Sequence, residues 1–298
     1  MKFSASMAAV LLAAVTTGAQ AADTLAKIAE TGKITLAYRE SSVPFSYLAG
    51  GEKPVGFSVE LSNAVADAVK KKLNKPNLEV ALMPVTSQNR IPLISNGTVD
   101  LECGSTTNNT ARAKDVSFAV NHFYTGTRLL VKKSSKIMNY ADLAKKTVAS
   151  TTGTTNALVM RKYNTEKNLG MDIVLGKDHA DSFLLVESDR AVAFAMDDIL
   201  LFGLMANAKN PADFEVVGDA LQVEPYACML PKDDPAFKKL VDDTVTGLMK
   251  SGELNKLYDK WFTQPIPPRN VSVNMPMTAS LKDAIAHPNS KPAEDYKK

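Results

Sequence analysis

The residues best suited to chemistry are polar side chains that follow predicted strands, and three of these groups contain or closely precede an arginine. Arg39, Arg90 and Arg112 occupy such places. A single arginine is usually a solvated surface charge, but three at equivalent positions indicate carboxylate recognition by planar guanidinium groups. Ser and Thr in these turns often only cap the next helix, although capped helix N-termini also attract anions. The polar groups are 39–42, 87–90, 105–107, 152–155, 177–179 and 197–198.

The motifs do not support a catalytic mechanism. The three histidines are His122, His179 and His287, and no sequence pattern links one of them to a nucleophile and an acid. The chain lacks GxSxG, HExxH, P-loop and CxxC motifs. Neither cysteine has a histidine or a second cysteine at metal-ligand spacing. We therefore predict no catalytic residue, no metal and no cofactor.

Predicted strands and helices alternate along the chain, which is typical of an α/β fold with largely parallel sheets. We expect Ser87 to cap a short helix that runs to Ile94, and the last ten residues to be solvated or disordered. The expected strands are 34–38, 79–84, 99–103, 126–133, 147–150, 172–175, 191–196, 215–217 and 226–230. The expected helices are 57–73, 87–94, one running from the turn at Thr155 to Tyr163, 181–187, 199–208, 235–251 and 253–262.

The first 22 residues have the pattern of a secretory signal peptide. Lys2 precedes the apolar stretch 7–15, and the small residues Ala19 and Ala21 flank Gln20 before the expected cleavage site. The apolar stretch is too short for a membrane span, which needs roughly 20 residues. The remaining chain is long enough for two lobes. Its net charge of +3 is too small to indicate nucleic-acid binding, so we expect a soluble, exported protein.

Cys103 and Cys228 both lie in the predicted mature region. Paired cysteines of an exported protein are more often bonded than free, because the compartment is oxidising. We therefore expect a Cys103–Cys228 disulfide, which would tie an early strand to a late one.

Several motifs, in the same order along the chain, resemble those of periplasmic solute-binding proteins of the polar amino acid class, and most closely the branch that binds glutamate and aspartate. This resemblance implies two α/β lobes of the type II arrangement with the ligand cleft between them, made from 23–125 plus 226–298 and from 126–225. It also implies two crossovers, near 124–131 and 219–227. The matching stretches are RESSVPFSY (39–47), VTSQNRIPL (85–93), NGTVDLECGSTTNN (96–109), GTRLLVKK (126–133), KDHADSF (177–183), RAVAFAMDD (190–198), YACMLPKDD (226–234) and KWFTQPIPP (260–268).

The resemblance also implies a role for individual residues and a set of partners. The α-carboxylate of the ligand would contact Ser105, Thr107, Arg112 and Thr155, and its ammonium would pair with Asp197. The distal carboxylate would lie among Arg39, Ser87, Arg90 and His179, the last of these as a possible imidazolium. Thr110-Ala111 and Ala113-Lys114 depart mildly from the pattern of the branch. The protein would act as a periplasmic monomer that delivers L-glutamate or L-aspartate to the permease subunits of an ABC transporter.

Two other functions are compatible with the same fold. Periplasmic cyclohexadienyl dehydratases share it, but such an enzyme needs an apolar pocket for a ring, whereas the predicted cleft is polar and rich in arginine. A sensor ectodomain would need a membrane or signalling segment, and none follows the predicted lobes. The sequence does not rank glutamate against aspartate, because they differ by one methylene group.

Overall fold

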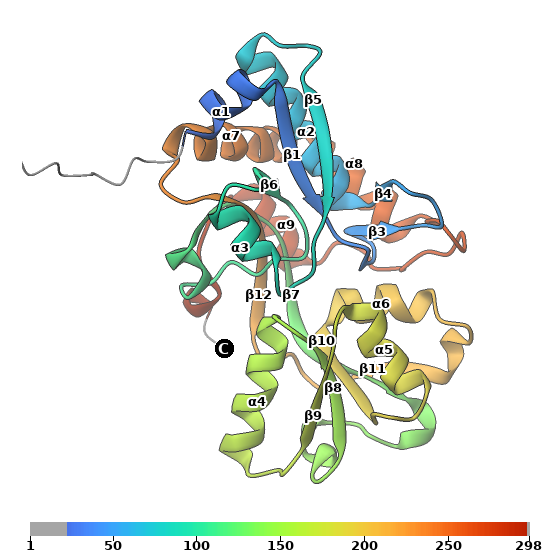
Figure 1. Cartoon of the computed structure of the whole chain (residues 1–298). Coiled ribbons are helices and arrows are strands. Elements are labelled where there is room, and N and C mark those ends of the chain that lie inside the picture. The colour runs from blue at the N-terminus through green and yellow to red at the C-terminus, as the bar shows by residue number, and fades with distance from the viewer. Residues whose placement is uncertain (1–22, 297–298) are drawn as a thin grey trace, which may run out of the picture.

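A computed structural model describes residues 23–296, which form two α/β lobes joined by two long strands (Figure 1). The signal peptide predicted for residues 1–22 lies outside the described residues. None of the helices described is both long and apolar enough to cross a membrane.

The first lobe is built on five strands in the order β5-β1-β6-β12-β7. Strand β1 pairs in parallel with β5 and β6, and β12 runs antiparallel to β6 and β7. Helices α1, α2 and α7 contact one another beside this sheet (Figure 1). The strands are β1 (Lys33–Tyr38), β5 (Glu79–Pro84), β6 (Leu101–Glu102), β7 (Val116–Lys132) and β12 (Val223–Pro231), and the helices are α1 (Thr24–Thr31), α2 (Phe57–Leu73), α3 (Arg90–Ser95), α7 (Pro235–Ser251), α8 (Glu253–Tyr258) and α9 (Ala279–Ala286).

The second lobe continues the sheet from the far half of β7. Strand β10 pairs with β7 and β8, β9 lies beyond β8, and β11 also pairs with β7. Helices α4, α5 and α6 pack on this sheet. The strands are β8 (Thr147–Thr151), β9 (Asp172–Gly176), β10 (Ala193–Asp197) and β11 (Phe214–Val217), and the helices are α4 (Thr155–Lys167), α5 (His179–Glu187) and α6 (Asp198–Ala206).

Strand β7 joins the lobes because its two halves have different partners. Residues up to Gly126 pair with β12, whereas Thr127 and the residues after it pair with β10 and β11. The sequence predicted a strand only from Gly126, so the element is longer than expected and carries one of the crossovers. Strand β12 runs beside it through the same region (Figure 1).

An aromatic cluster fixes the base of the first lobe next to the crossover. Phe45 packs edge-to-face on Phe57, Phe123, Tyr226 and Phe262, with ring centroids 4.9 to 6.0 Å apart. All five rings are buried. Edge-to-face pairs of this kind add to the stabilisation that burial alone provides. Phe45 follows the first strand of a small separate sheet of β2 (Ser41–Ser42), β3 (Ser46–Leu48) and β4 (Pro54–Val55).

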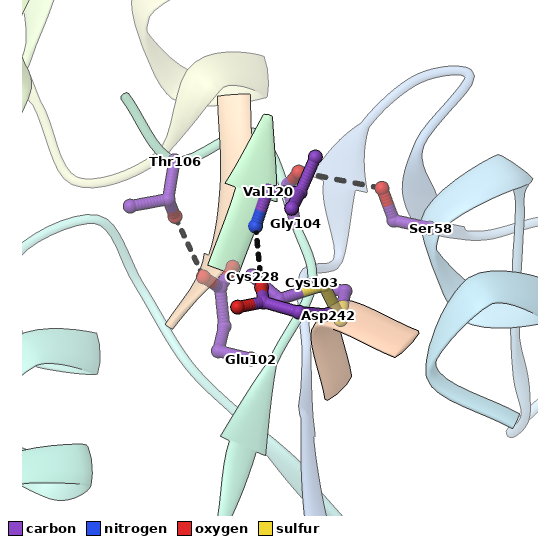
Figure 2. The surroundings of a disulfide bond; sticks show 8 residues. All are labelled: Ser58, Glu102, Cys103, Gly104, Thr106, Val120, Cys228 and Asp242. Atoms are coloured by element: carbon purple, nitrogen blue, oxygen red, sulfur yellow. Dashed lines mark hydrogen bonds between the residues drawn. A yellow bond between two sulfur atoms is a disulfide. The ribbon is translucent and has the colours of Figure 1, made fainter. Parts of the chain in front are cut away.

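The predicted disulfide is present and ties β6 to β12. Cys103 directly follows β6, Cys228 lies within β12, and their Sγ atoms are bonded (Figure 2). Both cysteines are buried. The bond therefore joins the strand that leads into the 105–107 turn to the strand that returns from the second lobe.

Two local expectations from the sequence are wrong. Helix α3 begins at Arg90 after Asn89, and Ser87 does not cap it, because Thr86 and Asn89 exchange the hydrogen bonds that close this turn. The end of the chain is also not wholly solvated, since residues 289–296 make hydrogen bonds to the first lobe. The Ser87 hydroxyl is therefore not used at the start of α3, and residues 289–296 are attached to the first lobe.

We expect the exported protein to take up no alkyl group when it is treated with a thiol reagent under denaturing conditions without reductant. After reduction it should take up two, because Cys103 and Cys228 are its only cysteines and they are bonded. Intact-mass measurement before and after reduction checks this. Uptake of two groups without reductant would contradict the disulfide.

Candidate ligand-binding site between the lobes

A small enclosed cavity lies where the two lobes meet, and both lobes line it. Seven of the nine residues predicted from the sequence line this cavity, and the other two, Arg39 and Arg112, are buried beside it. The complete lining is Ser87, Arg90, Ser105, Thr107, Thr154, Thr155, Asn156, His179, Met196, Asp197 and Leu200. The predicted residues therefore converge on one place, as expected for the carboxyl ends of strands in an open α/β sheet.

Two helices of the second lobe begin at this cavity. Thr155 is the first residue of α4, and the hydroxyl of Thr154 caps that helix by accepting from the Ala157 N–H at 3.2 Å. His179 is the first residue of α5, whose cap is Asp178. The first N–H groups of a helix have no partner within it, and the helix dipole adds positive potential there. Both starts are suited to a negatively charged ligand group.

Arg39 is fully buried although it is cationic. Its Nη2 lies 2.5 Å from an Asp178 carboxylate oxygen and 3.4 Å from His179 Nε2, so it reaches from the first lobe to the second. Its Nε and Nη1 have no hydrogen-bond partner among the described residues. Buried donors normally find a partner, so the Nε and Nη1 atoms of Arg39 are unsatisfied among the described residues, although Arg39 does not itself line the cavity.

Arg90 and Arg112 each bond to backbone carbonyls and retain further donors. Arg90 Nη1 donates to the Ser105 carbonyl at 3.2 Å, while its Nε has no partner within the described chain. Burial, and then the nearby charge of Arg112, lower the pKa of Arg90 to about 9, so it stays cationic at neutral pH. Arg112 donates to the carbonyls of Thr107 at 2.9 Å and Gly153 at 3.3 Å.

Asp197 is the acid that lines the cavity, at the end of β10. It accepts hydrogen bonds from Asn156 Nδ2 at 2.7 Å and from the Tyr226 hydroxyl at 2.5 Å. Burial, and then the charge of Glu224, raise its pKa to about 8. At this pKa the carboxyl group is largely protonated at neutral pH, and a cation that arrives beside it would favour the ionised form.

His179 does not supply the positive charge that the sequence allowed for. Burial, and then the charge of Arg39, lower its pKa to about 3, so the imidazole is neutral at neutral pH. Its Nδ1 lies 3.0 Å from the Thr151 hydroxyl. A neutral ring has one N–H donor and one acceptor nitrogen, so His179 can offer a hydrogen bond but no charge.

The two lobes touch across the cavity through short polar contacts. The hydroxyls of Thr107 and Thr155 are 3.4 Å apart. Gly153 has a φ of +78°, and a Cβ there would lie 2.6 Å from the Gln88 backbone, so only glycine allows this approach. The cavity has a volume of only about 10 Å³, so in this arrangement it has no room for an amino acid, and a ligand can be accommodated only when the lobes move apart.

Several residues of the site were not foreseen from the sequence. Glu224 is fully buried in β12 and accepts from the Thr155 hydroxyl at 2.9 Å. Tyr226 in the same strand reaches Asp197, and Asp178 pairs with Arg39. Glu224 could have been identified from the sequence, because it is a charged residue inside an otherwise apolar strand. The other unforeseen lining residues are Thr154, Asn156, Met196 and Leu200.

A larger groove of about 920 Å³ lies elsewhere, between the crossover strands and the C-terminal segment. It is lined by Tyr124, Gln222, Asp283 and His287 among others, and no arginine is included. Among residues 23–296 there is also no cluster of three or more metal-ligating side chains. The arginine-rich cavity is therefore the better candidate for recognition of a carboxylated small molecule.

Comparison with known proteins agrees with this geometry. The chain is 52% identical to the L-glutamate/L-aspartate-binding protein of Pseudomonas aeruginosa over 98% of its own length and 97% of that protein. It is also 52% identical to a glutamate/aspartate import solute-binding protein of Escherichia coli, over 91% of this chain and 90% of that one.

Solved structures give the same fold. A variant of ArgBP from T. maritima superimposes with a TM-score of 0.72 at 25% identity, covering 81% of this chain and all of that one. An ancestral amino acid-binding protein, described as a precursor of cyclohexadienyl dehydratase, superimposes with a TM-score of 0.68 at 28% identity, over 80% and 99% of the two chains. Residues 34–264 match the model of one protein family, and the chain belongs to that family, the bacterial extracellular solute-binding proteins, family 3.

Proposed function

We propose that this protein captures L-glutamate or L-aspartate in the cavity between its lobes and delivers it to the permease subunits of an ABC transporter. The observation that carries the proposal is the burial of three arginines around one small cavity that also contains a single lining carboxylate, Asp197. Two relatives at 52% identity are named for glutamate and aspartate. An acidic amino acid carries two carboxylates and one ammonium, which matches these charges.

The head group of the amino acid is assigned to the part of the cavity nearest the crossover strands. Arg112, Ser105, Thr107 and the N–H of Thr155 would bind the α-carboxylate, and Asp197 would bind the ammonium. The hydroxyl of Thr155 already donates to Glu224, so toward the ligand it can act only as an acceptor. The contact of Thr155 with the α-carboxylate, expected from the sequence, is therefore assigned to its N–H group alone.

The distal carboxylate is assigned to Arg39, Arg90, Ser87 and His179. Within the described residues, Arg39 and Arg90 have N–H groups without hydrogen-bond partners. The buried hydroxyl of Ser87 also has no partner there. Because Ser87 does not cap α3, its hydroxyl is available to the cavity. A neutral or basic ligand side chain would leave these donors unpaired, and such a loss typically costs a few kcal/mol.

Transport would follow from ligand-dependent closure. We assign residues 23–125 plus 226–298 to one lobe and 126–225 to the other, with the hinge where β7 changes partners. A ligand that contacts both lobes favours the closed form by its difference in affinity for the two forms. The closed monomer would then be the form that the permease recognises.

A catalytic function is less well supported. The family is one of solute-binding proteins, although one structural relative is the precursor of a dehydratase. Calorimetry with glutamate, together with a product assay after long incubation, separates the two functions. Binding without turnover is expected, and formation of a product would favour an enzyme.

Export to the periplasm is part of the proposal, through cleavage of the signal peptide predicted for residues 1–22. The mature chain recovered from the periplasm of a Gram-negative host should begin near Ala22, as measured by intact mass. A chain that keeps Met1 and stays in the cytoplasm would contradict export.

Replacing Arg112 or Asp197 by alanine should weaken glutamate and aspartate binding to the same extent, because both ligands share the head group. Truncating one partner of a buried, hydrogen-bonded charge pair typically costs about 2–5 kcal/mol. Isothermal titration calorimetry with both ligands measures this. A variant that binds within about threefold of the unmodified protein would show that the assigned contact is wrong.

Replacing Arg90 by methionine should weaken glutamate binding far more than glutamine binding. Methionine keeps much of the side-chain volume but removes the charged fork, and only glutamate leaves an uncompensated distal charge. The ratio of the two dissociation constants in one variant is the measurement, because a general loss of stability largely cancels in it.

The matched control is Arg161→Met on the exposed side of α4, which should leave both dissociation constants unchanged. An unchanged glutamate-to-glutamine preference in Arg90→Met would remove the main reason for assigning an acidic ligand.

A further inference from the structure

The segment that follows α9 packs against the first lobe near the crossover. Residues 293–295 of this segment contact β12, and the segment falls outside residues 34–264, the part matched by the family model. Residues 289–296 of this segment, which we call the strap, bond to two parts of the lobe, the loop at Asn108 and the strand at Asn121.

Asn108 is the main point of contact and is only 3% exposed. Its Nδ2 donates to the Ser290 carbonyl at 2.9 Å and to the Asn121 side-chain oxygen at 3.1 Å. Its own carbonyl accepts from the Ala293 N–H at 2.9 Å. Without the strap, a buried amide and a backbone carbonyl would each lose a partner, and unsatisfied buried polar groups are costly.

Further bonds hold the strap on both sides of this contact. The Asn121 N–H donates to the Asn289 carbonyl at 2.8 Å, and Asn121 Nδ2 donates to the Lys291 carbonyl at 2.9 Å. The Thr110 hydroxyl donates to a Glu294 carboxylate oxygen at 2.8 Å. The strap is therefore attached by main-chain and side-chain bonds at several points rather than by a single exposed pair.

The loop that the strap holds is the loop that presents two site residues. Asn108 directly follows Thr107, which lines the cavity. Arg112 closes the loop, because its N–H donates to Asn109 Oδ1 at 2.8 Å and its Nη1 donates to the Thr107 carbonyl at 2.9 Å. A shift of Asn108 would move the Thr107 carbonyl and with it the guanidinium of Arg112.

We propose that the strap is a positioning element for the amino-acid head group and that Asn108 is the positioning residue through which it acts. The inference rests on the proposed function, in which Thr107 and Arg112 bind the α-carboxylate. It adds to that function a part of the chain that touches no ligand and that lies beyond the segment matched by the family model.

The first test is Asn108→Asp in the full-length protein. The substitution keeps the side-chain size but turns an oxygen toward the carbonyl of Ser290 and the Asn121 oxygen, which accept at present. We expect affinity for glutamate and aspartate to fall by about tenfold or more, because small displacements of binding groups are costly. Affinity within about threefold of the unmodified protein would overturn the proposal.

A chain that ends at His287 removes the strap itself and should lose affinity in the same way. The matched control carries Asp283→Asn and His287→Gln, whose exposed side chains bond to each other at the end of α9, and it should bind as the unmodified protein does. If the shortened chain does not fold, the result with Asn108→Asp decides.

A double-mutant cycle separates positioning from a general loss of stability. Arg112→Lys alone should weaken binding, and adding Asn108→Asp to it should cause clearly less than its own single-variant loss, because both act on one contact. Losses that multiply fully would overturn the proposal. A full-length protein that binds neither acidic amino acid would overturn the proposed function together with the strap's role, whereas normal binding by Asn108→Asp overturns the strap's role alone.

Discussion

Arg39, Arg90 and Arg112 are withdrawn from water in one region between the lobes, and an ionised group in such a place needs compensating charge or hydrogen bonds. Their effect on one another is visible in Arg90, whose pKa is lowered by burial and then by the charge of Arg112. Glu102, Asp178 and Glu224 supply negative charge nearby. The fold has to bring these groups together from separate strands, and the helix starts, the disulfide and the crossover can be understood from that requirement.

The charged groups are divided between the two lobes, so the free-energy cost of removing them from water arises only when the lobes close. Arg39 pairs with Asp178, and Arg112 bonds to Gly153, so both arginines cross from the first lobe to the second. When the lobes part, these contacts open and the charged groups regain water. In the proposed function, closure removes this water and a ligand with two carboxylates replaces it. The free energy of closure is therefore coupled to the charge of whatever occupies the cavity.

Much of the site could be predicted from the sequence because polar residues at strand ends converge in an α/β sheet. The sequence was not enough to predict the state of a residue where that state depends on its neighbours in space. Ser87 stands where a cap is expected, yet Thr86 and Asn89 close that turn, and its hydroxyl has no partner in the part of the chain that the structure describes. His179 is neutral because it is buried and because Arg39 lies beside it, and the sequence reveals neither. The strap was missed because its polar composition is typical of a solvated tail, whereas its packing depends on buried partners, Asn108 and Asn121, that are far away in the sequence.

The acidic side of the cavity bonds to the crossover strand β12, whereas two of the three arginines lie away from the crossover strands. Arg39 follows β1, and Arg90 begins α3. Tyr226 and Glu224 both belong to β12, and they bond to Asp197 and Thr155 of the second lobe. With the proposed roles, the ammonium and α-carboxylate are held beside the strands that join the lobes, where a hinge motion displaces atoms least. Arg39, Arg90 and His179 then act on the part of the ligand that differs between amino acids. In the proposed function, the contacts to the shared head group and the contacts that select the side chain are therefore carried by different parts of the chain around the cavity.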